Sequence, residues 1–205
     1  MKFLSFVLIL AVSLPLMAMG CSSEGGGAGA GISRILGQAF APETDDAGET
    51  KEVPLAGATV VLLEYDENGE LQGATVGTTD AQGNFVVEDV QEQAVVVVQV
   101  AGMTSDGDAN VEGLFNPDQP TIVKDLDPAT SVACIAGVSA VGDGSITVEQ
   151  LDETRVQNLE DASRAYIAAN PEFDFYDSAQ VNAAVAAVRA ATDDGAHPAA
   201  ADAFT

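Results

Sequence analysis

The 205-residue chain has little of the chemistry from which enzyme active sites are usually built. It contains no tryptophan, one histidine and two cysteines, and aromatic residues make up only 5% of it. The histidine, His197, stands beside Pro198 near the end of the sequence, so serine and cysteine nucleophiles lack a histidine base. No glycine-rich phosphate loop joins a strand to a helix, and carboxylates are too abundant for any pair to be diagnostic. We therefore expect a protein that is not an enzyme.

Basic residues are also scarce. Seven Lys and Arg residues stand against 32 Asp and Glu residues, and the formal net charge is −25. Such an acidic chain repels phosphate backbones and anionic lipid headgroups, which argues against nucleic acid as a partner and against direct adhesion to a membrane surface. The same acidity keeps a protein soluble, suits a salty medium and is compatible with divalent cations.

The two cysteines are too few for a disulfide framework. Cys134 lies in the apolar run Val132-Ala133-Cys134-Ile135-Ala136, where a thiol usually behaves as a small buried hydrophobic group. An intermolecular disulfide through Cys134 remains the alternative interpretation.

The N-terminus has the pattern of an export signal. Lys2 is followed by a short apolar run from Phe3 to Met19, which is too short and too poorly flanked for a membrane span. We therefore expect residues 1–20 to be a signal peptide and the protein to be exported.

The end of this signal, Ala18-Met19-Gly20-Cys21, resembles the lipobox of bacterial lipoproteins, although Ala18 stands where leucine is usual. The resemblance implies a lipoprotein with Cys21 carrying acyl chains such as palmitate, and ordinary signal cleavage is the alternative. Several acyl chains on one residue hold a protein firmly to a bilayer. Residues 21–31 would then be the lipidated cysteine and a glycine-rich tether. The expected location is the cell envelope, at the outer membrane or cell surface.

Short strand patterns separated by turn residues fill residues 32–125. A loop is expected at 41–53, because it is acidic and contains proline. The Asn68-Gly69 pair favours a tight hairpin, and Asp80 to Asn84 reads as another turn. Strands are expected at 32–40, 58–65, 70–77, 85–88, 94–101 and 121–124.

Three segments of this region resemble the carboxypeptidase regulatory-like family. They are Leu36-Gly37-Gln38-Ala39, Pro54-Leu55-Ala56-Gly57-Ala58-Thr59-Val60-Val61-Leu62 and Thr79-Asp80-Ala81-Gln82-Gly83-Asn84-Phe85. The resemblance implies a β-sandwich with a prealbumin-like (transthyretin-like), carbohydrate-binding-like fold over residues 32–125. It marks Gly57, Asp80, Gly83 and Phe85 as structural turn residues and implies no particular activity, since such modules accompany many functions.

Residues 126–195 are expected to form about three helices. Asp127-Pro128 begins a helix to about Val141, and two capping boxes, Thr147/Gln150 and Asp177/Gln180, begin helices ending near Ala169 and Gly195. A tail at 196–205 follows. Strands 58–63 and 94–100 are apolar on both faces, so one face should meet the opposing sheet and the other should meet these helices. The expected fold class is thus α+β: an antiparallel β-sandwich of about seven strands followed by helices packed on or beside it.

One acidic segment between Gly102 and Gly113 has the spacing of a calcium loop. Oxygen ligands at alternate positions of an extended loop can turn toward one cation. The glycine and final glutamate of a known calcium loop are not at their required positions, which favours a solvated acidic loop instead. The candidate ligands are Asp106, Asp108, Asn110 and Glu112.

These patterns lead to two function hypotheses. The first is a lipid-anchored envelope protein whose sandwich binds or adheres to a polysaccharide or an envelope protein without a cofactor. The second is a structural or assembly subunit of an envelope complex, because the last helix is rich in alanine. The few aromatics weaken a glycan-stacking platform; the candidates are Tyr65, Tyr166, Phe173, Phe175 and Tyr176.

Overall fold

The protein is described by a computed structural model over residues 32–66, 69–91, 95–117 and 119–193. The expected signal peptide, Cys21, the tether and the tail with His197 lie outside these residues. Within the described ranges the fold is α+β, with nine strands and three α-helices. No helix in these ranges is long and apolar enough to cross a membrane.

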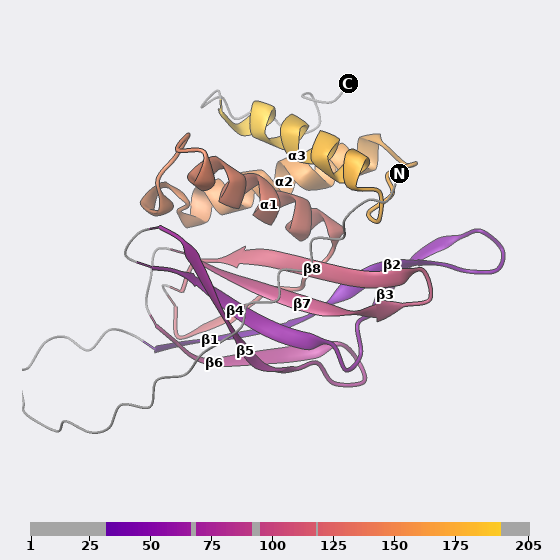
Figure 1. The fold of residues 1–205 in the computed structure, drawn as a ribbon, viewed down its shortest axis with the longest axis horizontal. Coiled ribbons are helices and arrows are strands. Elements are labelled where there is room, and N and C mark those ends of the chain that lie inside the picture. Colours follow the sequence, from indigo (N-terminus) through magenta and orange to yellow (C-terminus); the bar gives the residue numbers. More distant parts are fainter. Residues whose placement is uncertain (1–31, 67–68, 92–94, 118, 194–205) are drawn as a thin grey trace, which may run out of the picture.

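The strands form two larger sheets and one separate ribbon (Figure 1). The three-stranded sheet has the order β6-β1-β9, with bounds Asn84–Gln91, Ile32–Gln38 and Thr121–Val123. The four-stranded sheet has the order β5-β4-β7-β8, with bounds Leu71–Thr78, Thr59–Tyr65, Val96–Thr104 and Gly107–Phe115. The ribbon pairs β2 with β3, with bounds Phe40–Thr44 and Thr50–Pro54.

Two features of the sheets differ from the sequence-based prediction. The described strands number nine where about seven were expected, and β1 pairs with β9 in parallel, whereas the other strand pairs are antiparallel. The parallel pairing follows from the long connection between β6 and β9, which passes through the four-stranded sheet before returning beside β1.

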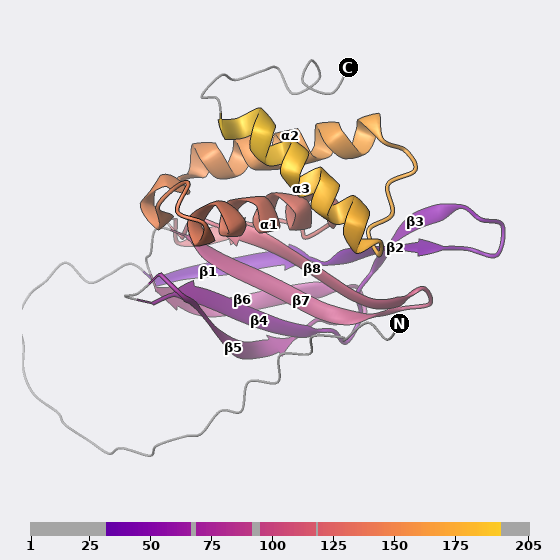
Figure 2. The same cartoon turned by 45° about the horizontal axis from the view of Figure 1, so that its top comes forward.

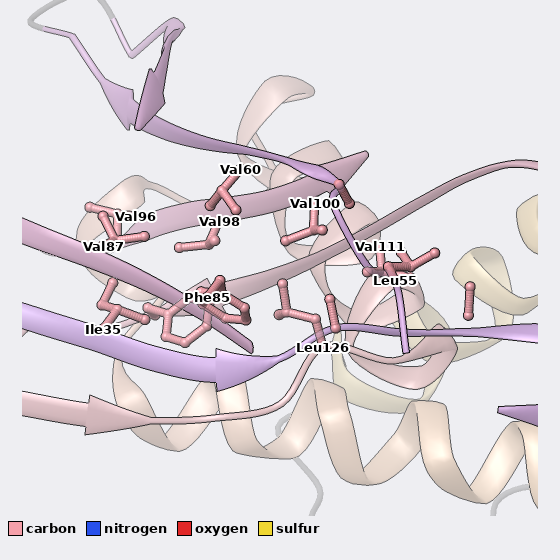
Figure 3. Packing of buried hydrophobic residues seen from close by; sticks show 14 of the residues in the cluster. Ile35, Leu55, Val60, Phe85, Val87, Val96, Val98, Val100, Val111 and Leu126 are labelled. Atoms are coloured by element: carbon pink, nitrogen blue, oxygen red, sulfur yellow. The ribbon is translucent and has the colours of Figure 1, made fainter. Parts of the chain in front are cut away.

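One hydrophobic cluster joins the two larger sheets. Ile35 and Phe85 from the three-stranded sheet meet Val60 and Val98 from the four-stranded sheet, and all four are at most 2% exposed (Figure 3). Each of these side chains contributes about 1.5–3 kcal/mol by leaving water. The alternation of buried and exposed residues in β6 arises because successive side chains of a strand point to opposite faces.

The valine run of β7 is buried on both faces, as the sequence predicts. Val96 and Val98 belong to the cluster between the sheets, whereas Val97 and Val95, which directly precedes the strand, belong to a second cluster formed with the helices. Figure 2 shows the three helices stacked on one side of the sheets. Their bounds are Pro128–Gly142 for α1, Glu153–Ala169 for α2 and Ser178–Asp193 for α3.

The helix starts confirm one prediction and correct two. Asp127 caps α1 in a full capping box with Thr130. The Thr147/Gln150 box closes only a short 3₁₀ turn, and α2 begins at Glu153 because the Asp152 carboxylate accepts a hydrogen bond from the Arg155 amide.

The α3 start is also simpler than the predicted capping box. The Asp177 carboxylate accepts a hydrogen bond from the Ala179 amide, whereas Gln180 Oε1 accepts from the Asp174 amide and not from that of Asp177. Gln180 therefore ties the preceding loop to the helix.

The segment 41–53 is not a loop, as its composition suggested, but the β2–β3 ribbon. Its turn is held by Asp45 Oδ1, which accepts hydrogen bonds from the amides of Ala47 and Glu49, and Gly48 takes a φ of +80°. Pro42 is tolerated because it lies on an outer edge, where a missing N–H breaks no ladder bond. The expected loop at 102–113 is likewise the β7–β8 hairpin.

The turn from Asp80 to Asn84 has the geometry that its residues favour. Asp80 Oδ1 accepts hydrogen bonds from the amides of Gln82 and Asn84, and Gly83 has a φ of +76°. A Cβ atom on Gly83 would lie 2.9 Å from the carbonyl oxygen of Ala39, so close backbone approach also requires glycine there.

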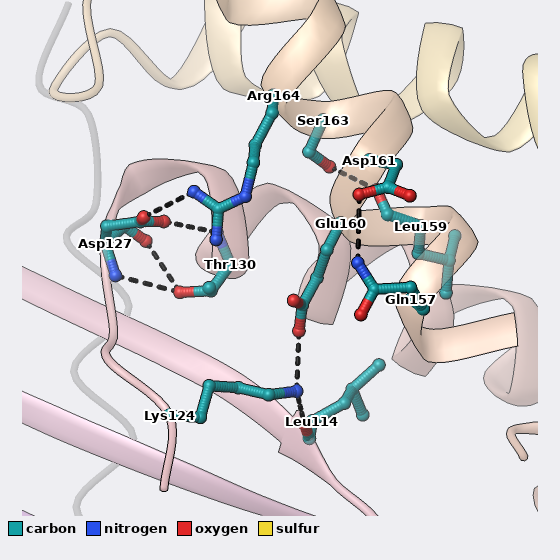
Figure 4. A network of polar contacts seen from close by, with 10 residues as sticks. All are labelled: Leu114, Lys124, Asp127, Thr130, Gln157, Leu159, Glu160, Asp161, Ser163 and Arg164. Carbon is teal, nitrogen blue, oxygen red and sulfur yellow. Dashed lines mark hydrogen bonds and ion pairs between the residues drawn. The ribbon is translucent and has the colours of Figure 1, made fainter. Parts of the chain in front are cut away.

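A partly buried ion pair fastens the helices to the strands. Lys124 Nζ, just after β9, donates to Glu160 Oε1 of α2 at 2.6 Å and to the carbonyl oxygen of Leu114 at 2.7 Å (Figure 4). The same ammonium lies 5.1 Å from the centroid of the Phe115 ring.

Candidate functional site

The β2–β3 ribbon projects beyond the two sheets as an arm (Figures 1 and 2). We call residues 40–54 the arm. Its buried base, near Ala41 and Leu55, belongs to the core between the sheets, whereas β3 is mostly exposed. The arm is therefore a ribbon anchored at one end, and its tip extends beyond the helices.

Two adjoining hollows separate the arm from the helices and the β7–β8 hairpin. We call them together the arm cleft. The first has a volume of about 360 Å³ and the second about 530 Å³, both in the usual range of binding sites. They share Pro42, Thr50 and Phe173.

The first hollow is lined by apolar residues and by an ion pair. Pro128 of α1 and Ile167 of α2 contribute apolar surface. Asp127 uses both carboxylate oxygens: Oδ1 accepts from the Thr130 amide, and Oδ2 accepts from Arg164 Nη1 at 2.8 Å (Figure 4). This cap fixes the guanidinium of Arg164 beside the start of α1.

Glu52 of β3 faces this ion pair from the arm. Desolvation in the cleft raises the pKa of Glu52, the nearby Asp127 carboxylate raises it further, and Arg164 acts in the opposite direction.

The second hollow is polar and acidic. Asp106, Glu172 and Asp174 line it together with Tyr176. The Tyr176 hydroxyl donates to the Pro42 carbonyl at 2.6 Å and lies 3.0 Å from Thr104 Oγ1. Burial raises the pKa of Tyr176, so this phenol stays neutral and holds the α2–α3 loop against the arm.

The candidate calcium ligands are not brought to one centre. Asp108, Asn110 and Glu112 lie on β8, where alternate residues share a face but spread over about 13 Å from the first to the last. Asp106 instead accepts a hydrogen bond from the Thr44 amide at 2.7 Å and joins the β7–β8 turn to the arm. The part of the chain that the structure describes holds no group of three or more His, Cys, Asp or Glu residues arranged for a metal.

Glu112 is half-buried and Cys134 is buried. Burial raises the pKa of Glu112, and a hydrogen bond from Gln99 Nε2 at 3.3 Å acts in the opposite direction. Cys134 is 1% exposed, and burial raises the pKa of its thiol well above the ordinary value, which makes it a poor nucleophile.

The aromatic residues serve packing. Tyr166 and Phe173 meet edge to face with ring centroids 6.4 Å apart, and Phe175 packs against the core between the sheets. Burial raises the pKa of Tyr65 to about 12. Among the described residues no aromatic side chain is among the exposed large hydrophobics.

The arm cleft was missed in the sequence because its outer wall was expected to be a loop. The alternation in Thr50-Lys51-Glu52-Val53-Pro54 is polar on both faces, which hides a strand. The signal that would have predicted the β2–β3 ribbon is the turn from Asp45 to Glu49, because it is flanked by two segments of equal length that can pair.

Comparisons with known proteins do not identify the chain. No family model and no curated protein matches it. Among solved structures, a 9R-lipoxygenase from Cyanothece PCC8801 aligns with 74% of this chain at 13% identity and a TM-score of 0.29. The chain spans 27% of that protein's length, and a likeness of this size carries no weight for fold or activity.

Proposed function

We propose that the chain is a non-catalytic binding protein of the cell envelope. In this proposal residues 32–125 are a prealbumin-like β-sandwich of the carboxypeptidase regulatory-like type, and residues 126–195 cover one of its faces. The hydrophobic cluster that the two larger sheets share supports the sandwich assignment. A lipid on Cys21 and the tether at 21–31 would hold this body to a membrane, at the outer membrane or cell surface.

The observation that carries the binding assignment is the arm cleft. A ribbon that is buried only at its base leaves both a strand and two hollows open to a ligand. The cleft offers apolar surface beside carboxylates, which suits a polypeptide. Its aromatic residues, Phe173, Phe175 and Tyr176, are partly buried and pack edge to face with other rings, so they are less suited to the stacking by which sugars are usually held. We therefore place a protein partner in the cleft, and a polysaccharide is the competing ligand class.

The experiment fills the cleft and asks whether a partner is lost. Ala168 is exposed on α2 and lines the first hollow, so Ala168→Trp should block it. The matched variant, Ala186→Trp, places the same bulk on the outer face of α3. Each tagged full-length protein is recovered from its own cells after mild solubilisation and cross-linking. One partner that is kept by A186W and lost by A168W supports the proposal, whereas equal recovery by both variants contradicts it.

The alternative is an assembly subunit without a ligand, which the surface of α3 favours. Its exposed residues Ala179, Ala183, Ala186 and Ala190 follow helical spacing on one face, and small residues permit close helix packing. The same pair of variants separates the two functions, because an α3 interface predicts loss of the partner in A186W and its retention in A168W.

The anchor has its own test. Cells that express the full chain are labelled with an alkyne analogue of palmitate, with Cys21→Ser as the matched variant. Incorporation into the wild-type chain and not into C21S, together with release of C21S from membranes, supports lipidation. Equal membrane association without label would show that another feature retains the protein.

A further inference from the structure

We propose that the outer edge of β3 receives an extended, basic segment of a protein partner as an added strand. This inference rests on the proposed function, because it names the partner class and the binding mode of the same arm cleft. Strand addition supplies affinity through main-chain hydrogen bonds and selectivity through alternate side chains.

The ladder of the arm shows which backbone groups of β3 face outward. The Asp45 amide donates to the Glu49 carbonyl, and the Leu55 amide donates to the Ala39 carbonyl. Hydrogen-bonded positions of an antiparallel pair alternate, so odd-numbered residues of β3 face β2. The backbone groups of Thr50 and Glu52 consequently point away from β2.

The outer edge of β2 is already occupied. The Phe40 amide donates to the Leu126 carbonyl at 2.8 Å, and the Thr44 amide donates to Asp106 Oδ2 at 2.7 Å. Between them, the Pro42 carbonyl accepts from the Tyr176 hydroxyl. The body of the protein thus satisfies this edge at each outward position.

The outer edge of β3 contrasts with that of β2. Within the described ranges, no hydrogen bond engages the outward backbone groups of Thr50 and Glu52. Such an unpaired edge is a template for another strand, unless the protein covers it. Pro54 ends the edge, since it has no N–H to offer.

This edge borders the first hollow. Thr50, Lys51 and Glu52 all line it. Pro42 of β2, which pairs with Glu52, lines the hollow as well, so the hollow lies against the face of the arm that borders this edge. Ile167 and Phe173 line the opposite wall. A guest strand would lie about 4.8 Å from β3, with alternate side chains directed at this apolar wall.

The charges of the cleft specify a basic guest. Both basic residues of the first hollow are already paired, Lys51 with Asp45 and Arg164 with Asp127. Among the described residues, no basic side chain pairs with the remaining carboxylates of the two hollows, which are Glu52, Asp106, Glu172 and Asp174. The net charge of −25 adds a long-range attraction for cations. We therefore infer a segment that alternates apolar residues with lysine or arginine.

The probe is a labelled nonapeptide of alternating lysine and valine, titrated with the full-length protein in mild detergent and followed by fluorescence anisotropy. Three peptides are compared: this one, a glutamate–valine peptide, and a lysine–valine peptide N-methylated at every second residue along one edge. N-methylation keeps the charge of the peptide and removes the main-chain N–H donors of that edge. We expect the first peptide to bind and the second not to bind. The third should bind with an affinity at least roughly tenfold lower than that of the first, because several hydrogen bonds are lost.

A variant pair tests the edge on the protein side. Glu52→Pro removes the outward N–H of Glu52 and leaves the β2–β3 ladder bonds in place, whereas Glu52→Ala removes the carboxylate and keeps the N–H. We expect the affinity for the lysine–valine peptide to be lower in E52P than in E52A by about fivefold or more. The unfolding midpoint of each variant shows whether the arm is intact. The N-methylated peptide tests strand addition on the unaltered protein.

The outcomes distinguish strand addition from the proposed function, which is the binding of a protein partner in the arm cleft. Equal binding of the N-methylated and plain peptides, or equal effects of E52P and E52A, would overturn strand addition. If A168W still loses the native partner in that case, the cleft remains a binding site with a different mode. If A168W keeps the native partner, the proposed function fails as well.

Discussion

Removing the Lys124 ammonium should strongly destabilise the fold, because it would leave Glu160 without its cation. The Lys124 and Glu160 side chains are 23% and 8% exposed, and the two charged atoms lie 2.6 Å apart. Breaking a fully buried pair costs about 3–5 kcal/mol. Partial exposure of Lys124 lowers this, so Lys124→Met should cost about 2–4 kcal/mol, or roughly 4–16 °C in melting temperature for a chain of this size.

The assay is urea unfolding followed by circular dichroism, in a double-mutant cycle with Glu160→Leu. The double variant removes both charges and should recover most of the loss, since a buried ion pair exchanged for apolar side chains is often neutral. The matched control is Arg34→Met in the Arg34–Glu88 pair, whose side chains are 47% and 57% exposed. Arg34→Met should cost under about 1 kcal/mol. Comparable costs for Lys124→Met and Arg34→Met, or strictly additive effects in the cycle, would refute the reasoning.

Three further predictions concern the interior. Gly37→Ala would drive a Cβ atom into the Lys124 carbonyl oxygen, so it should lower the melting temperature sharply or abolish folding, as thermal unfolding would show. Burial raises the pKa of Glu112 above its ordinary 4.5, so the native state binds the proton more tightly than the unfolded state does. The stability of the fold therefore falls as the pH rises from 4.5 through the raised pKa of the native state. Glu112→Gln should therefore raise the melting temperature at pH 7 and have little effect below about pH 4. In the Cys21→Ser chain, the buried Cys134 thiol should resist Ellman's reagent until urea unfolds the protein; rapid reaction in buffer would contradict its burial.

The sequence predicts those elements in which one local signal decides the structure. The valine run of β7 requires cover on both faces, and the structure provides a sheet on one side and helices on the other. Asp127-Pro128 begins a helix through local contacts alone, because Asp127 is the N-cap and Pro128 is in the first turn. Gly83 takes a positive φ after an aspartate that bonds two amides. In each case the residues involved lie within a few positions of one another.

The arm and its cleft depend on contacts that are distant in sequence. The outer edge of β2 is satisfied by Leu126, Tyr176 and Asp106, which come from three other parts of the chain. No periodicity in the arm itself reveals these partners, so a proline-containing acidic stretch reads as a loop. The same limit explains the calcium hypothesis, because alternate carboxylates look alike in an extended loop and in a strand.

The most direct test of the account is site-specific photo-cross-linking in intact cells. A photoreactive residue at Thr50 in the cleft is compared with one at Thr75 on the exposed strand β5, each with and without Ala168→Trp. The account predicts one discrete protein adduct from position 50 that disappears with Ala168→Trp, and no such adduct from position 75. Adducts of equal yield from both positions, or an adduct at position 50 that survives Ala168→Trp, would contradict a partner seated in the arm cleft.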